Sequence, residues 1–154
     1  EQAKQLGINA KIYSADGFSN PKIFELAPKS ANGIIFTQKA ENLSQVKKDF
    51  ETKYQAKYGE KPDAFALNSY DGARILMSAI KQAAEIKDGK LVIDRDKVQK
   101  IVAATKEFDG ASGKITFTAN GDLVANIGIW ISENNQYKQV KAYKLENDKI
   151  IEIK

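Results

Sequence analysis

A carboxylate followed by a glycine and an aromatic residue, at residues 16–18, has the placement of a ligand-binding loop. Asp16, Gly17 and Phe18 follow a short apolar alternation over residues 10–14 that predicts a β-strand. In open α/β sheets ligands bind beyond the carboxyl ends of the strands, and a carboxylate there can hold an ammonium group. The same residues are also explained by an Asp-Gly turn that only redirects the backbone and binds no ligand. Turn preferences alone favour this second interpretation.

Other catalytic chemistry has little support in the sequence. The chain has no histidine and no cysteine, so zinc sites built from those ligands, His-assisted serine catalysis and Cys–His pairs are excluded. Ser112 lies between glycines without the spacing of a nucleophile elbow, which favours a tight turn before a strand. No glycine-rich phosphate loop is present, and residues 94–96 do not extend into a calcium loop. The sequence therefore predicts no enzyme activity, no metal and no cofactor.

The net charge of +4 does not indicate a nucleic-acid partner. Only Arg74 and Arg95 are arginines among the 24 basic residues, and the lysines are scattered rather than clustered with aromatic residues. Arginine forks are the side chains that read phosphates and base edges best. We interpret the charge as a contribution to solubility.

The first forty residues alternate between helical and strand patterns. Residues 1–6 have the character of the last turns of a helix that stops at Gly7. A strand over 10–14, a short helix over 21–26 and a buried strand over 34–37 follow. This alternation favours a parallel sheet flanked by helices.

Three amphipathic helices are expected next. Apolar spacings of three and four predict a helix from residue 41 or 42 to about residue 58, a second over 69–86, and a third that begins at Asp94. Asp71 is expected in the first turn of the second helix, where negative charge is favourable. The residues expected on the inner face of that helix are Tyr70, Ala73, Leu76, Met77, Ile80 and Ala84.

The last part of the chain is predicted to be rich in β-structure. Polar and glycine-containing turns are expected at 119–122, 134–135 and 146–148. The strands expected around them cover residues 114–117, 124–132, 137–145 and 149–153.

Five blocks in a fixed order resemble the branched-chain amino-acid type of solute-binding protein that serves ABC importers. They are AKIYSADGF (10–18), ANGIIFT (31–37), FxxxYxxxYGxxP (50–62), AxxSYD (66–71) and FDGASGKITFxxxGD (108–122). The resemblance spans nearly all 154 residues, and it covers the C-terminal part of such proteins, less than half of the usual chain.

The resemblance implies an α/β fold of Rossmann-like lobes, the type I periplasmic binding protein fold, here incomplete and with a C-terminal β-rich segment. It implies that residues 1–40 and 127–154 belong to the C-terminal lobe and that residues 41–126 cross into the other lobe. In these proteins two lobes close on a ligand by hinge motion. The chain is thus expected to be a fragment that carries at most half of the binding cleft.

The same resemblance implies the site residues. The acidic residue of the family that matches Asp16 binds the ligand's α-ammonium group, so the resemblance reverses the preference for a simple turn; Gly17 belongs to the same loop. An aromatic wall of the pocket matches Phe65. Asn68 and Tyr70 are weaker candidates because they are only nearby, and Phe18 is a candidate by adjacency. The expected site thus consists of Asp16, Gly17, Phe18, Phe65, Asn68 and Tyr70.

The function implied is that of an extracytoplasmic or periplasmic solute-binding protein. Its partners would be a small amino acid or related solute and an ABC permease; a signal peptide is not seen in this chain. A ligand-sensing domain of a receptor or regulator with the same fold is the alternative, because fold alone does not determine function. Apolar faces left without a partner in the fragment lead us to expect a homodimer or a strand exchange.

Overall fold

The chain forms two compact units. The structure is a computed structural model that describes residues 1–146 and 149–153. Unit 1 consists of Glu1–Glu41 together with Asn126–Lys154, and unit 2 is the intervening Asn42–Ala125. The turn expected at residues 146–148 includes residues 147 and 148, which lie outside the described part of the chain.

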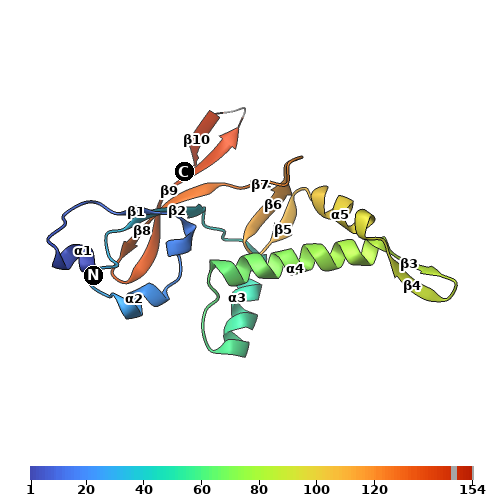
Figure 1. Cartoon of the computed structure of the whole chain (residues 1–154), viewed down its shortest axis with the longest axis horizontal. Helices are drawn as coiled ribbons and strands as arrows, with labels where there is room; N and C mark the ends of the chain where they lie inside the picture. The colour runs from blue at the N-terminus through green and yellow to red at the C-terminus, as the bar shows by residue number, and fades with distance from the viewer. Residues whose placement is uncertain (147–148, 154) are drawn as a thin grey trace. The chain divides into compact units, whose positions relative to one another are not determined.

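Unit 1 is a five-stranded mixed sheet with short helices (Figure 1). The strand order is β1-β2-β8-β9-β10; β1 and β2 are parallel, and the other neighbours are antiparallel. The sheet is therefore mixed rather than wholly parallel, because the C-terminal meander joins the first two strands instead of forming a layer of its own. Its elements are α1 (Gln2–Gln5), β1 (Tyr13–Ser14), the 3-10 helix η1 (Asp16–Phe18), α2 (Lys22–Leu26), β2 (Ile35–Lys39), β8 (Ile127–Glu133), β9 (Gln136–Glu146) and β10 (Lys149–Ile153).

Local chemistry explains the ends of these elements. The Asn20 side chain accepts a hydrogen bond from the Lys22 backbone N–H two residues later, which closes a turn just before α2. Gly7 has a φ of 70°, which is the left-handed conformation that stops α1.

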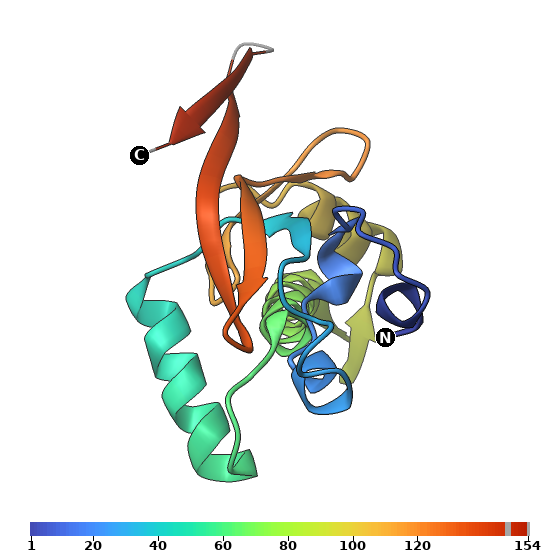
Figure 2. The same cartoon turned by 90° about the vertical axis from the view of Figure 1, so that its left-hand side faces the viewer.

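Figure 2 shows the long twisted ribbon of β8 and β9 continuing into β10 at the edge of the sheet.

The core of unit 1 is small. Phe36 on β2 is 1% exposed and is its largest buried side chain. Strands β2 and β8 pair from Ile35–Ile131 to Lys39–Ile127, and the Ala40 N–H donates to the Asn126 carbonyl at 2.9 Å just beyond. The two segments of unit 1 are therefore hydrogen-bonded up to the points where the chain passes into unit 2.

Unit 2 combines three helices with two small sheets. Its elements are α3 (Gln45–Tyr58), α4 (Ala64–Ala83), β3 (Ala84–Lys87), β4 (Lys90–Ile93), α5 (Arg95–Ala103), β5 (Phe108–Gly110), β6 (Gly113–Phe117) and β7 (Leu123–Val124). Ser44, Asp63 and Asp94 cap the three helices, each through a side-chain oxygen that accepts from a backbone N–H three residues later. All strand pairs in this unit are antiparallel. The segment expected as one strand over 124–132 is split between β7 of unit 2 and β8 of unit 1.

The second helix differs from its sequence-based prediction in both position and face. It begins after the Asp63 cap, five residues before the expected Ser69, and ends at Ala83 rather than Ile86. Asp71 therefore lies in the second turn, and it is fully buried. The buried stripe follows every fourth residue through Asp71, Ile75, Ala79 and Ala83, whereas Leu76 and Met77 of the predicted inner face are 48% and 62% exposed.

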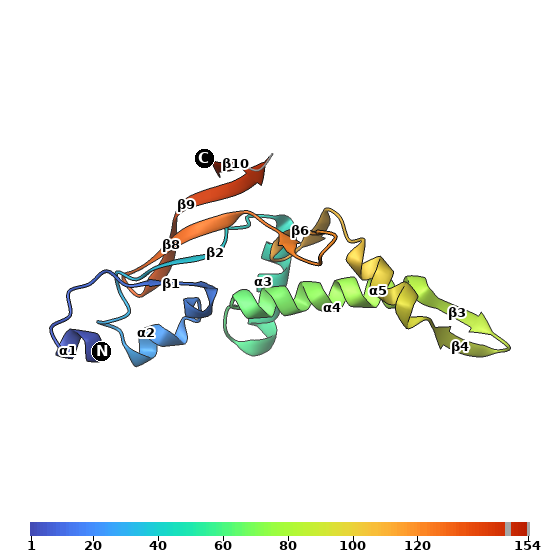
Figure 3. The same cartoon turned by 45° about the horizontal axis from the view of Figure 1, so that its top comes forward.

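The end predicted for that helix is instead a β-hairpin. Strands β3 and β4 pair across a turn at Asp88-Gly89, and both turn residues have positive φ. Figures 1 and 3 show the hairpin extending past the C-terminal end of α4. Cross-strand pairing places Ala84 with Ile93 and Ile86 with Leu91. Because side chains alternate along a strand, these four residues form one apolar face of the hairpin.

Candidate functional site

The predicted acidic residue lies on a short turn directly after strand β1. Asp16 opens η1 and is exposed to solvent, and its carboxylate accepts the N–H of Gly17 at 3.0 Å. Backbone bonds from Phe18 N–H to the Ala15 carbonyl and from Ser19 N–H to the Asp16 carbonyl close the turn. No ion pair of Asp16 occurs among the described residues. The backbone that carries the Asp16 carboxylate is therefore fixed by these hydrogen bonds, and the carboxylate can bind an external cation.

A tyrosine from the far end of the chain holds this turn in place. The Tyr137 hydroxyl on β9 lies 2.7 Å from the Phe18 carbonyl and 2.9 Å from the Asn20 carbonyl. Its ring contacts Phe18, Phe24 and Phe36, with centroid distances between 4.8 and 5.9 Å. Burial raises the pKa of Tyr137 to about 12. The hydroxyl therefore stays protonated, and remains a donor, at neutral pH.

The remaining predicted residues lie on the first two turns of α4 in unit 2. Phe65 is 51% exposed, which leaves its ring available for an apolar contact. Asn68 lies one turn later on the same helix. Tyr70 packs on Phe50 of α3 with a centroid distance of 4.3 Å, and the Arg74 guanidinium lies 5.5 Å from its ring. Tyr70 thus takes part in the packing of α4 against α3 and is also partly exposed to solvent.

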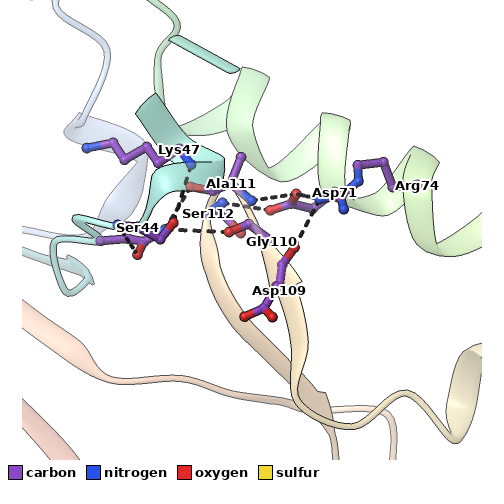
Figure 4. Close-up of polar contacts among 9 residues, drawn as sticks. Ser44, Lys47, Asp71, Arg74, Asp109, Gly110, Ala111 and Ser112 are labelled. Atoms are coloured by element: carbon purple, nitrogen blue, oxygen red, sulfur yellow. Dashed lines mark hydrogen bonds and ion pairs between the residues drawn. The ribbon is translucent and has the colours of Figure 1, made fainter. Parts of the chain in front are cut away.

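Directly after Tyr70 on α4, the buried Asp71 fastens the loop between β5 and β6 (Figure 4). Its two carboxylate oxygens accept the N–H groups of Ala111 and Ser112, each at 2.7 Å. A Cβ added at Gly110 would lie only 2.5 Å from one of these oxygens, so this approach requires glycine. The β5–β6 loop is therefore bound to α4 through the Asp71 carboxylate, and glycine at position 110 makes this approach possible.

Two more side chains complete this cluster. Arg74 lies 3.6 Å from the Asp71 carboxylate, donates to the Asp109 carbonyl at 3.0 Å and covers the ring of Phe108. Just before α3 and its Ser44 cap, the Asn42 amide donates to the Ala111 carbonyl and to the Ser44 hydroxyl. The start of α3, helix α4 and the β5–β6 loop are therefore joined by polar bonds, as Figure 4 shows.

The structure thus gathers the predicted residues into two groups, one in each unit. Asp16, Gly17 and Phe18 share one turn, and Phe65, Asn68 and Tyr70 share one helix. Sequence reasoning missed the role of Tyr137, which lies more than a hundred residues from the turn it contacts. It also misplaced Asp71, although the glycine at 110, before the alanine and serine that Asp71 binds, is a signal of a close backbone approach.

Comparison with known proteins gives a family match over most of the chain. A model of a family described as periplasmic binding protein matches residues 1–134. The chain is 28% identical over 124 residues to the Leu/Ile/Val-binding protein BraC3 of Rhizobium johnstonii, covering 80% of this chain and 32% of that protein. It is 26% identical to a leucine-, isoleucine-, valine-, threonine- and alanine-binding protein of Pseudomonas aeruginosa, covering 79% and 31%. The chain spans about a third of the length of these relatives.

Solved structures show the same fold. The leucine binding protein LivK of Thermotoga maritima is 30% identical with a TM-score of 0.79, over 93% of this chain and 40% of that one. The branched-chain amino acid substrate-binding protein LivJ of Streptococcus pneumoniae, solved in complex with isoleucine, is 25% identical with a TM-score of 0.71, over 99% of this chain and 40% of that one.

Proposed function

We propose, from the premise that this chain belongs to the periplasmic binding protein family, that it takes part in capturing a small amino acid outside the cytoplasm. The fold is that of type I periplasmic binding proteins, and the family is one of binding proteins rather than enzymes. The relatives are named for leucine, isoleucine and valine, which favours an aliphatic amino acid as the ligand. The name of LivJ, a branched-chain amino acid transporter substrate-binding protein, favours a transport role over a sensing role.

The observation that carries the proposal is the Asp16 turn. An exposed carboxylate stands just beyond the carboxyl end of β1, which is parallel to β2. An amino acid presents an ammonium group that such a carboxylate binds through charge-assisted hydrogen bonds. Gly17 and Phe18 then form the floor of the ammonium site, and Asp16 supplies its charge.

Phe65 is proposed to contact the aliphatic side chain of the ligand. Its ring is half exposed at the start of α4, a position in which an apolar contact would remove it from water. Asn68 and Tyr70 on the same helix turns are proposed as neighbours of that contact. We propose that unit 1 and unit 2 are parts of two different lobes, which close on the ligand and deliver it to an ABC permease.

Localisation and assembly follow from the same proposal. The family is extracytoplasmic, and among residues 1–146 and 149–153 no helix is both long and apolar enough to cross a membrane. A second copy of the chain is proposed to cover part of the apolar surface that each unit exposes.

The proposal is tested by titrating the isotopically labelled 154-residue chain with L-leucine and following amide chemical shifts by NMR. We expect the Gly17 and Phe18 amides to shift saturably, even where the affinity is only millimolar. The ligand 4-methylpentanoate, which is leucine without its ammonium group, should leave these amides in place. The Asp16→Asn variant should weaken leucine binding about tenfold to a hundredfold, because a hydrogen bond to a charged group is lost.

The matched control is Asp88→Asn, which removes an exposed carboxylate from the β3–β4 turn while keeping a residue that tolerates its positive φ. This variant should bind leucine as the wild type does. If leucine and 4-methylpentanoate shift the turn equally, or if Asp16→Asn binds as tightly as the wild type, the ammonium site is elsewhere.

A further inference from the structure

We propose that Tyr137 is a positioning residue for the ammonium site, acting through the backbone of the Asp16–Asn20 turn. The inference rests on the proposed function for its connection to a ligand, while the positioning itself is a property of the unliganded chain. It assigns to the start of β9, which sequence reasoning had treated only as a strand, a part in fixing the acidic residue.

The hydroxyl reaches both sides of one residue of the turn. Its single proton is shared between the carbonyl of Phe18, which precedes Ser19, and the carbonyl of Asn20, which follows it. The Ser19 N–H in turn donates to the Asp16 carbonyl at 2.9 Å, and Ser19 is 6% exposed. Because one residue is held from both sides, the peptide that carries Asp16 has little freedom to rotate. The direction in which the Asp16 side chain leaves the backbone is therefore set by the sheet.

Tyr137 can act as an anchor because its own position is well fixed. It pairs with Ser132 across the β8–β9 hairpin. Ser132 exchanges backbone bonds with the segment before β2, donating to the Ile34 carbonyl at 3.0 Å and accepting from the Gly33 N–H at 2.7 Å. At the hairpin turn, Asn135 and Asn32 bond each other through amide and backbone groups. The anchor is thus part of the hydrogen-bonded sheet rather than of a loop.

The ring and the hydroxyl of Tyr137 have separable tasks. The ring packs edge-on against Phe18 and Phe36 and tilted against Phe24, which fills the space beneath the turn. The hydroxyl adds the contacts that fix the backbone direction. Phenylalanine at this position would keep the first task and remove the second. A site held within a narrow range of geometry binds more tightly because less ordering remains to be done on binding.

The test uses Tyr137→Phe in the whole chain and measures amide hydrogen exchange without ligand. We expect exchange at the Phe18 and Ser19 amides to accelerate about fivefold, the value for loss of one typical hydrogen bond. The sheet amides of Gly33 and Ile35, which bond Ser132 and Ile12, should change less than twofold. The control is Tyr143→Phe on the same strand, which should leave the turn amides unchanged.

A second measurement links the turn to the ligand. Leucine should bind Tyr137→Phe about fivefold more weakly than it binds the wild type, and 4-methylpentanoate should still leave the turn amides in place. Turn amides that exchange within twofold of the wild type overturn the proposal. Equal acceleration throughout the sheet also overturns it, since the hydroxyl would then stabilise unit 1 as a whole. If the wild type binds no amino acid, the proposed function fails, and the exchange result still decides the role of Tyr137.

Discussion

At the scale of single residues, the Tyr137 hydroxyl both contacts the Asp16–Asn20 turn and has a raised pKa. Burial raises its pKa from 10.0 to about 12, so the folded chain favours the protonated hydroxyl. In the unfolded chain the proton leaves at a lower pH. The stability that this group contributes is therefore fully present below pH 10 and is lost as the pH rises toward about 12.

This shift predicts a separate step in the alkaline titration of tyrosinate absorbance. Subtracting the curve of Tyr137→Phe from that of the wild type should leave a single tyrosinate with a midpoint near 12. Ultraviolet spectroscopy at increasing pH measures this difference directly. A difference curve centred at the ordinary value of 10.0 would mean that the hydroxyl is not shielded from water in solution.

Residue-level prediction from sequence succeeded where the signal was local. The turn at Asp16–Phe18 follows from a strand pattern that ends in Asp-Gly, and the structure has a turn there. The Tyr137 contact joins positions 117 to 119 residues apart, and no local pattern encodes such a pairing. The ligand roles of Asp16, Gly17, Phe18, Phe65, Asn68 and Tyr70 remain predictions.

At the scale of elements, the contact between α4 and the β5–β6 loop depends on the absence of one methyl group. Gly110 lets the Asp71 carboxylate approach the N–H groups of Ala111 and Ser112. An added Cβ would lie 2.5 Å from the carboxylate and 2.7 Å from the Gly113 carbonyl. Both distances are shorter than such contacts allow, so helix and loop would have to separate.

Gly110→Ala should therefore lower the free energy of unfolding of unit 2 by about 1–3 kcal/mol, as expected for overpacking. Urea unfolding followed by circular dichroism of the helices measures the change. Gly72→Ala on helix α4 is the control, because its Cβ meets nothing within 4 Å; it should raise the stability by up to about 1 kcal/mol.

A double-mutant cycle identifies the cause of that loss. In an Asp71→Ala background the added methyl group no longer meets the carboxylate, so Gly110→Ala should cost measurably less than in the wild type. An equal cost in both backgrounds would assign the loss to the Gly113 carbonyl instead.

Elements were predicted well where a periodic pattern had clear ends. The helices ending at Tyr58 and beginning after Asp94 follow their caps and stops. Helix α4 was misplaced because Asp63 caps it before the apolar period is visible, and because its buried stripe contains an aspartate and two alanines and only one large apolar residue. Residues 84–93 were assigned partly to that helix, although Asp88-Gly89 is also a typical hairpin turn.

At the scale of the whole molecule, large apolar side chains are exposed in both units. On the β3–β4 hairpin, Ile86 and Leu91 are 71% and 64% exposed on one face. On the β9–β10 edge of unit 1, Leu145 and Ile150 are 66% and 78% exposed and lie directly opposite each other. Exposed apolar patches of this kind mark association surfaces.

We therefore predict concentration-dependent self-association of the chain. Sedimentation velocity over a dilution series should show a dimer that dissociates on dilution. Ile86→Lys combined with Leu91→Lys should shift the equilibrium toward the monomer if the hairpin contributes, and Leu145→Lys with Ile150→Lys tests the sheet edge. A monodisperse monomer at every concentration would contradict the prediction.

The pairing of β2 with β8 gives the chain path a simple topological meaning. These antiparallel strands remain bonded through Ala40 and Asn126, and all of unit 2 runs between them. Unit 2 is thus, in connectivity, the loop of a β-hairpin. A hairpin needs as few as two residues to close, and the entropy of closure rises only slowly with loop length. The sheet can therefore accept or lose such an insertion without any change of strand register. Replacing residues 42–125 by a short turn should leave Asp16 and Tyr137 on one continuous scaffold.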